Sequence, residues 1–325
     1  MTVARIVIAA MLCFGAISAA AEEPVDNYPS RAIRFISPFP PGGGTDVLAR
    51  GLADRLQAAF RQPVIVENKP GLGTLLAAEV IAKSQPDGYT FGIASSSTYG
   101  ISPLLYPKFS TNPVRDLTPI ARIGATNFFL VSSPTLPARN LKDLIELIRT
   151  NPGKFNYASS GTGTPHHLYM EVLKSQLGLD IQHIPYKGSA QAIIDFYSGK
   201  IELMFLDGSL AIPNIKAGKA IGMGTAMAVQ SLLLDSVAPI AATVPGYDWD
   251  SWQGLAGPAG MPWSFVTKLA AEMRRYQGTP EYRDMMMKIG MEPLPPIPPE
   301  QMADFVKNDL GRWSQAVKTS GAKPD

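Results

Sequence analysis

The stretch ISPFPPGGGTD, residues 36–46, places two adjacent prolines and three consecutive glycines before a threonine and an aspartate. An apolar run at residues 32–37 leads into it, and Leu48, Leu52 and Leu56 follow at helical spacing. This order puts a glycine loop at the carboxyl end of a strand, where open parallel sheets bind ligands. Glycine also lets the backbone approach a ligand closely. The stretch therefore predicts an α/β fold with a ligand-binding loop. A catalytic loop, a phosphate cradle and a carboxylate receptor all fit this pattern.

The first 21 residues have the features of a secretory signal peptide. They contain one arginine, an apolar core and a run of small residues that ends at Ala21. We expect cleavage after Ala20 or Ala21. The only cysteine of the chain, Cys13, lies in this leader, so the exported protein contains neither a disulfide nor a thiol.

The charge balance argues against a nucleic-acid partner. Lys and Arg total 29 and Asp and Glu total 27, and removal of Arg5 with the leader leaves 28 against 27, a net charge of +1. No basic stripe of the kind that binds nucleic acid is present. After the leader, no apolar stretch reaches the roughly 18 residues of a membrane-spanning helix.

Strand-like and helix-like runs alternate along the chain. Expected strands cover residues 32–37, 63–67, 89–94, 128–132, 155–158, 181–185, 201–206 and 221–227. Expected helices cover residues 47–60, 74–83, 140–150, 165–177, 189–198, 262–276, 280–289 and 299–320. This alternation predicts mostly parallel sheets flanked by helices.

We predict two such lobes with a ligand cleft between them, where pockets are common. Residues 27–126 form the first part of lobe 1 and residues 127–248 form lobe 2. Residues 249–325 return to lobe 1 and are expected to be mainly helical, without strands of their own.

Three loops share the order of strand, glycine turn and helix start, at residues 40–46, 69–74 and 159–165. Each contains residues suited to cap the following helix, namely Thr45 or Asp46, Thr74 and Thr164. A single loop of this kind is usually only a tight turn, but three in one chain favour a binding site. The first loop lacks the third glycine of a dinucleotide motif, and no Lys-Ser or Lys-Thr follows it. A helix N-terminus attracts anions, so a small carboxylate fits better than a nucleotide.

Catalytic and metal-binding residues are scarce. There is no nucleophile elbow and no evident nucleophile–base pair, which disfavours a hydrolase. His167 and Glu171 share a helix face, but zinc requires a third protein ligand. We expect His167 to face the loop or the cleft with its ring fixed by Glu171, and His166 to face solvent. Asp207 ends a buried strand, so it points into the cleft, caps the helix that begins near Ser209, or does both.

Eight short motifs occur in the order YPSR (28–31), PFPPGGGTD (38–46), VENKPG (66–71), PDGY (86–89), YASSGTG (157–163), PYKG (185–188), IKAGK (215–219) and GPAG (257–260). Together they resemble the Bug family, the periplasmic solute-binding receptors of tripartite tricarboxylate transporters. The resemblance extends over nearly the whole chain after the leader.

The resemblance implies a type II-like periplasmic-binding-protein fold, not an enzyme, that closes on a small organic acid. Family ligands include di- and tricarboxylates, acidic amino acids and aromatic acids. A monomer without cofactor or metal would deliver the ligand to membrane permease subunits; the alternative is a receptor that signals to a sensor kinase. Position by position, the implied ligand-binding residues are Phe39, Pro41, Gly43, Gly44, Thr45, Ser95, Ser96, Asn127, Ser160, Gly161, Gly163, Thr164, His167 and Asp207.

Overall fold

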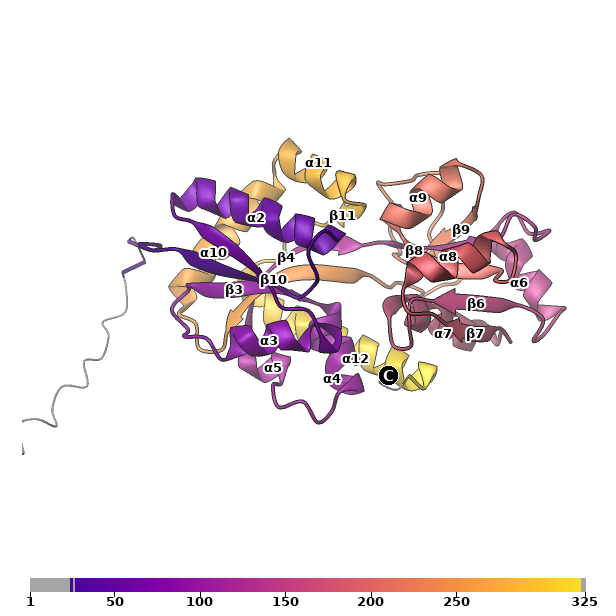
Figure 1. Ribbon diagram of the computed structural model, residues 1–325, viewed down its shortest axis with the longest axis horizontal. Coiled ribbons are helices and arrows are strands. Elements are labelled where there is room, and N and C mark those ends of the chain that lie inside the picture. Colours follow the sequence, from indigo (N-terminus) through magenta and orange to yellow (C-terminus); the bar gives the residue numbers. More distant parts are fainter. Residues whose placement is uncertain (1–23, 26, 323–325) are drawn as a thin grey trace, which may run out of the picture.

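The computed structural model describes residues 24, 25 and 27–322, and the predicted signal peptide at residues 1–21 lies outside this range. Two mixed β-sheets, each flanked by helices, form two lobes side by side (Figure 1). Among the residues that the structure describes, none of the helices combines the length and apolar character needed to cross a membrane.

The first lobe contains a six-stranded sheet in the order β11-β4-β10-β3-β1-β2. Its strands are β1 (Ile33–Ser37), β2 (Val64–Asn68), β3 (Thr90–Ser95), β4 (Leu117–Thr126), β10 (Ser251–Pro258) and β11 (Met291–Pro293). Its main helices are α2 (Gly44–Phe60), α3 (Leu75–Ala82), α10 (Trp263–Gln277) and α11 (Pro280–Lys288). Shorter turns are η1 (Leu72–Thr74), the π-helical η2 (Ser97–Ile101), α4 (Ser102–Leu105) and α5 (Pro113–Asp116).

The second lobe contains a five-stranded sheet in the order β7-β6-β8-β5-β9. Its strands are β5 (Phe128–Ser132), β6 (Asn156–Ser159), β7 (Gln182–Pro185), β8 (Leu203–Asp207) and β9 (Ile221–Thr225). Its helices are α6 (Leu141–Arg149), α7 (Pro165–Leu177), α8 (Ser189–Tyr197), α9 (Gly208–Lys216) and the short η3 (Ile240–Ala242).

The α/β two-lobe class is confirmed, but the sheets are mixed rather than mostly parallel. In the first sheet, β1 is parallel to β2 and β3, while β10 is antiparallel to both β3 and β4. In the second sheet, β6 is parallel to β7 and β8, while β5 is antiparallel to β8 and β9.

The expectation that the C-terminal part has no strands is wrong, because β10 and β11 both join the first sheet. Strand β10 has the sequence SWQGLAGP, whose two glycines, alanine and proline have low strand propensity. All its residues are nevertheless buried between β3 and β4. Tertiary packing rather than local preference therefore makes this segment a strand.

Helix α12 (Pro299–Ser320) connects the two lobes. It packs on β4 and η2 in the first lobe, and its C-terminal part reaches α7 in the second (Figure 1). Near that end, the ring of Trp313 lies 5.8 Å from that of Tyr169 and 5.2 Å from that of Trp249. The last helix therefore contributes to the cores of both lobes, and the lobe limits at residues 126 and 248 stay a prediction.

A buried carboxylate anchors α12 to the first sheet. Asp309 Oδ2 accepts hydrogen bonds from the indole nitrogens of Trp252, at 2.7 Å, and of Trp313, at 3.0 Å. Burial raises the pKa of Asp309 to about 6, although the hydrogen bonds from the two indoles act to lower it.

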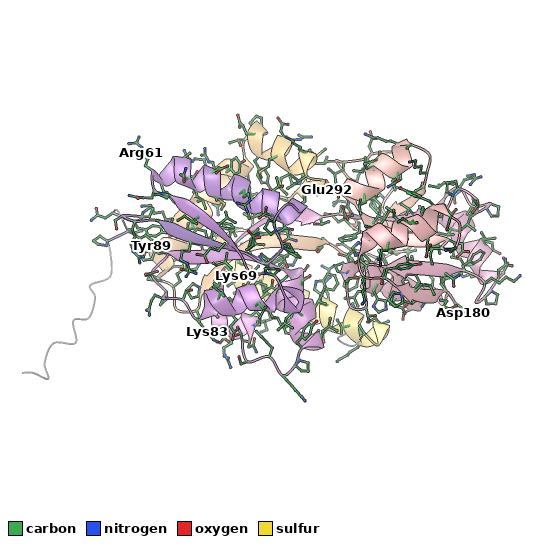
Figure 2. All side chains as sticks on the ribbon, viewed as in Figure 1. Arg61, Lys69, Lys83, Tyr89, Asp180 and Glu292 are labelled. Atoms are coloured by element: carbon green, nitrogen blue, oxygen red, sulfur yellow. The ribbon has the colours of Figure 1, made fainter. Side chains whose placement is uncertain are left out.

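A second buried carboxylate, Glu292 of β11, lies at the boundary between the lobes (Figure 2). Its Oε1 accepts from Asn127 Nδ2 at 3.2 Å and from the hydroxyl of Ser231, and its Oε2 accepts from Leu232 N at 3.2 Å. Asn127 lies where the chain passes from β4 to β5, and Ser231 follows β9. This cluster therefore joins the first sheet to the second lobe at the crossover.

Candidate functional site

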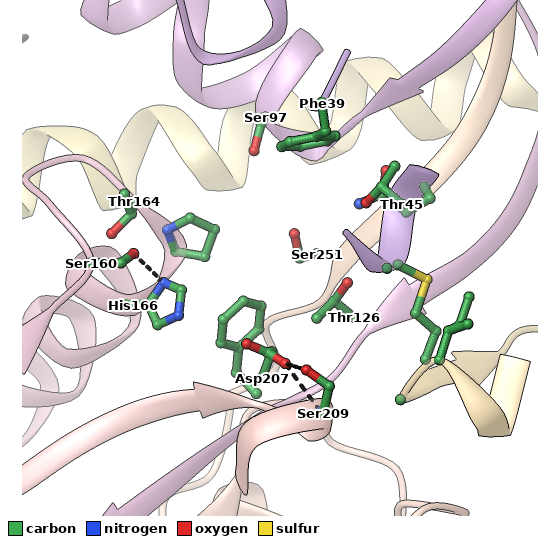
Figure 3. Close-up of a pocket in the computed structure, with 17 residues that line it drawn as sticks. Phe39, Thr45, Ser97, Thr126, Ser160, Thr164, His166, Asp207, Ser209 and Ser251 are labelled. Carbon is green, nitrogen blue, oxygen red and sulfur yellow. Dashed lines mark hydrogen bonds between the residues drawn. The ribbon is translucent and has the colours of Figure 1, made fainter. Parts of the chain in front are cut away.

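A cavity of about 380 Å³ opens between the lobes and receives residues from both (Figure 3). Six predicted site residues line it: Phe39, Gly44, Thr45, Ser160, Thr164 and Asp207. Its volume lies in the range of small-molecule pockets.

The N-terminus of α2 forms the first-lobe wall. Helix α2 begins at Gly44, earlier than predicted, and its N-cap Gly43 provides no side-chain hydrogen bond. Neither residue predicted to cap this helix does so. Asp46 is instead buried, where its carboxylate accepts from Arg50 Nε and Gly42 N at 3.0 Å and from Asn68 Nδ2 at 2.7 Å. Burial opposes ionisation of Asp46, but these three hydrogen bonds lower its pKa overall. The first-turn N–H groups of α2 thus keep their capacity to bind an external acceptor.

The N-terminus of α7 forms part of the opposite wall. Thr164 is its N-cap but makes no side-chain cap, because its hydroxyl donates to Gly161 O at 2.7 Å. His166, in the first turn, lines the cavity rather than facing solvent as predicted. Its Nδ1 lies 2.8 Å from Ser160 Oγ and its Nε2 lies 3.4 Å from Ser189 Oγ. Burial lowers the pKa of His166 to about 4, so the ring is neutral at pH 7.

His167 faces the second-lobe loop, one of the two directions predicted for it, and does not line the cavity. Its ring is buried and stacks on that of His183 at 4.1 Å between centroids, and its Nδ1 accepts from Gly163 N at 3.1 Å. Glu171 does not fix this ring, since it accepts from the Tyr157 hydroxyl. Consecutive helix residues point about 100° apart, so the face that turns one histidine to the cavity turns its neighbour to the core. Within the described part of the chain, no group of three His, Cys, Asp or Glu residues could hold a metal.

Asp207 has both of the roles considered for it. It is the N-cap of α9, where its Oδ1 accepts from Ser209 N at 3.0 Å and from the Ser209 hydroxyl. Its carboxylate also lines the cavity (Figure 3). Among the cavity-lining residues that the structure describes, Asp207 is the only acidic one, and none is lysine or arginine.

Eight predicted residues do not line the cavity: Pro41, Gly43, Ser95, Ser96, Asn127, Gly161, Gly163 and His167. Pro41 and Gly43 are exposed on the outer part of their loop. Asn127 turns away because its amide donates to Glu292. Gly161 and Gly163 shape the second-lobe loop, with positive φ values of 136° and 78° that glycine adopts readily.

The two serines at the end of β3 point into the protein. Ser95 is buried and exchanges hydrogen bonds with Thr98, and Ser96 is buried against Ser251, with 3.5 Å between the hydroxyl oxygens. The turn into η2 instead presents Ser97 to the cavity. The sequence therefore predicted the neighbouring segment correctly, but not which serine of that segment faces the cavity.

Eleven lining residues were not predicted. The polar ones are Ser97, Thr126, His166, Ser209, Ser251 and Gln253. The others are Phe128, Pro165, Ile289, Gly290 and Met291. Most come from β4, β10 and β11 or from segments next to them, and the sequence pattern did not show these strands. Three of the unpredicted residues are close in sequence to predicted ones, namely Pro165, His166 and Ser209. The orientation of their helices decides which of the neighbouring side chains reach the cavity.

Two lobes joined by crossovers, with a small-molecule cavity between them, define a solute-binding protein of the periplasmic type. Residues 48–322 match the family described as "Tripartite tricarboxylate transporter family receptor". The chain belongs to this family, whose members are periplasmic binding receptors rather than enzymes.

Relatives and solved structures agree with this assignment and with the Bug resemblance. The chain is 30% identical over 308 residues to "Protein BugT" of Bordetella pertussis, covering 94% of each chain. The structure "R. palustris Rpa4515 with adipate" has 31% identity and a TM-score of 0.78, covering 92% of this chain and 100% of that one. The structure "MatC (Rpa3494) from Rhodopseudomonas palustris with bound malate" has 26% identity and a TM-score of 0.71, covering 89% and 100%.

Proposed function

We propose that this receptor captures a small organic carboxylate in the cavity between its lobes and delivers it to the permease subunits of a tripartite transporter. The observation that carries the proposal is the approach of two helix N-termini, those of α2 and α7, to one cavity without side-chain caps. Adipate and malate, bound in the two similar structures, are both carboxylates and support this ligand class.

The donors around the cavity suit an anion that is held without a cationic side chain. The orphan N–H groups at the start of α2 carry the positive end of the helix dipole, which favours a carboxylate. Hydroxyl groups of Thr45, Ser97 and Ser160 surround the same space, whereas the hydroxyl of Thr164 already donates to Gly161 O. Such neutral donors bind a carboxylate through several hydrogen bonds, and those to a charged acceptor are the stronger kind.

Export to the periplasm and action as a monomer are further parts of this proposal. They rest on the leader pattern before Ala21 and on the family to which the chain belongs. Cells that express the permease should accumulate labelled ligand only when the receptor is present. Uptake that is independent of the receptor would favour the alternative of signalling.

A thermal-shift screen followed by calorimetry tests the ligand class. The panel should pair each carboxylate with its neutral amide, so that only the anionic group differs. Ligand at 100 times its Kd stabilises the native state by about 2.7 kcal/mol, which raises the melting temperature measurably. We expect the acids to bind and the amides to fail. Stabilisation by sugars or cations, with no response to any carboxylate, would refute the proposal.

A further inference from the structure

The cavity has an uneven distribution of charge. Asp207 contributes one negative charge, and within the described residues no lysine or arginine of the lining offsets it. His166 does not supply a positive charge at pH 7, because burial lowers its pKa to about 4 even though the nearby charge of Asp207 acts in the opposite direction. Lys187, next to the second-lobe loops in sequence, is exposed and lies outside the lining.

Two acceptor groups in this cavity lack a protein donor. Asp207 uses Oδ1 to bind Ser209, and its Oδ2 has no hydrogen-bond partner among the described residues. Gln253 of β10 also lines the cavity, with its side chain 4% exposed. Its carboxamide oxygen is likewise unpartnered in the described part of the chain. The Gln253 oxygen is buried without a partner, which is costly, and a ligand that donates a hydrogen bond to it would relieve that cost. Asp207 is only partly buried, so its free oxygen is open to a donor group of a ligand.

We propose that the ligand is an aminocarboxylate with a single carboxylate at the α2 and α7 N-termini and a cationic amino group that faces Asp207 and Gln253. This inference rests on the proposed function, because it takes the carboxylate position from there. It narrows the substrate class from organic acids in general to zwitterions without net charge.

Electrostatics disfavours the main competitor, a dicarboxylate that spans the cavity. Its second carboxylate would face Asp207 without an intervening cation. At a separation of about 5 Å in a partly buried site, two like charges weaken binding by roughly 100-fold. An ammonium group at the same place gains a comparable attraction and donates to the free acceptors.

Matched ligand pairs test the inference on the unaltered protein. Suitable pairs are glutarate with 5-aminopentanoate, adipate with 6-aminohexanoate, and terephthalate with 4-(aminomethyl)benzoate. Calorimetry at pH 7 should give the amino partner of the best pair an affinity at least about tenfold higher. Tighter binding of the dicarboxylate in every pair would overturn the inference.

The variant Asp207→Asn tests the contact itself. Asparagine caps helices as well as aspartate does, so α9 should stay folded while the charge is removed. We expect the aminocarboxylate to bind about 10- to 100-fold more weakly, and the dicarboxylate to bind equally well or better. Asp180→Asn is the matched control, because Asp180 lies at the outer end of the second lobe (Figure 2) and should leave both affinities unchanged.

The outcomes separate this inference from the proposed function. If no acid of either kind binds, the carboxylate site itself is wrong. If acids bind but Asp207→Asn leaves the aminocarboxylate affinity unchanged, only the assignment of the amino group is wrong. The melting temperature of the variant, measured without ligand, shows that a loss of affinity is not a loss of fold.

Discussion

Replacing Gly44 by aspartate separates the contribution of the α2 N-terminus to binding from its contribution to folding. Gly44 is the first residue of α2 and lines the cavity. A Cβ atom added there would lie 3.6 Å from Ile289 O and 3.9 Å from Met291 Cε, both ordinary contacts. The backbone at Gly44 is not in the left-handed region, so a larger residue fits without strain.

Folding and binding should respond to Gly44→Asp in opposite directions. A carboxylate in the first turn of a helix stabilises it by about 0.3–1 kcal/mol. The same carboxylate, about 5 Å from a bound anion at an effective dielectric constant near 20, opposes binding by about 3 kcal/mol. The melting temperature without ligand should therefore stay the same or rise. Affinity for the tightest acid of the panel should fall by roughly 100-fold or more.

Calorimetry on Gly44→Asp and Gly44→Asn, each with the same acid, isolates the effect of charge. The two side chains have nearly the same size, so any steric loss is common to both. Partly buried charges are screened weakly, and the difference should persist in 0.5 M salt, where the Debye length is only about 4 Å. Equal affinities of the two variants would refute the placement of an anion at this helix end.

Two further predictions concern buried titratable groups. The pKa of His183 is lowered to about 4, mainly by burial. Between that value and the ordinary pKa of about 6.5, the unfolded chain binds a proton on this residue that the folded chain does not. His183 therefore lowers the free energy of unfolding as the pH falls through this range. Between pH 7 and pH 5, the free energy of unfolding measured in urea should therefore fall by about 2 kcal/mol less in His183→Gln than in the parent protein. An equal fall in both proteins would contradict the burial of a neutral ring. Asp309→Leu leaves two buried indole N–H groups without an acceptor and should cost about 2–5 kcal/mol at pH 7, whereas Asp309→Asn keeps an acceptor oxygen and should cost far less. A similar cost for both substitutions at Asp309 would show that its charge, not its acceptor oxygen, stabilises the α12 contact.

The elements that sequence predicted best are those whose local pattern and final environment agree. Strand β5 and helix α7 have the predicted limits, and Gly178 ends α7 in the left-handed conformation that glycine adopts readily. Asn140 caps α6 by accepting from Asp143 N at 2.9 Å. Strand β10 could not be predicted in this way. Its residues become a strand only because β3 and β4, distant in sequence, enclose them on both sides.

The sequence located several of the segments that form the site, but it did not always identify which side chain of a segment lines the cavity. The loop before α2 was found from its glycines, whereas Gln253 and Ser251 belong to the strand that was missed. His166 and His167 illustrate the second difficulty. Both stand in the first turn of α7, and the choice between them depends on how that helix rotates against the second sheet, which a single sequence does not specify.

The helix ends at the cavity differ in a way that links stability to ligand polarity. Helix α2 begins without a side-chain cap, and because its N-cap is Gly43 this costs the free protein only about a few tenths of a kcal/mol. A ligand carboxylate would supply the missing acceptor, so part of this cost is recovered on binding. Helix α9 already carries its own anion, Asp207, and can accept only a cation or a neutral donor there. Because an uncapped and a capped helix end meet in one cavity, the two together would orient a ligand with opposite charges at its ends.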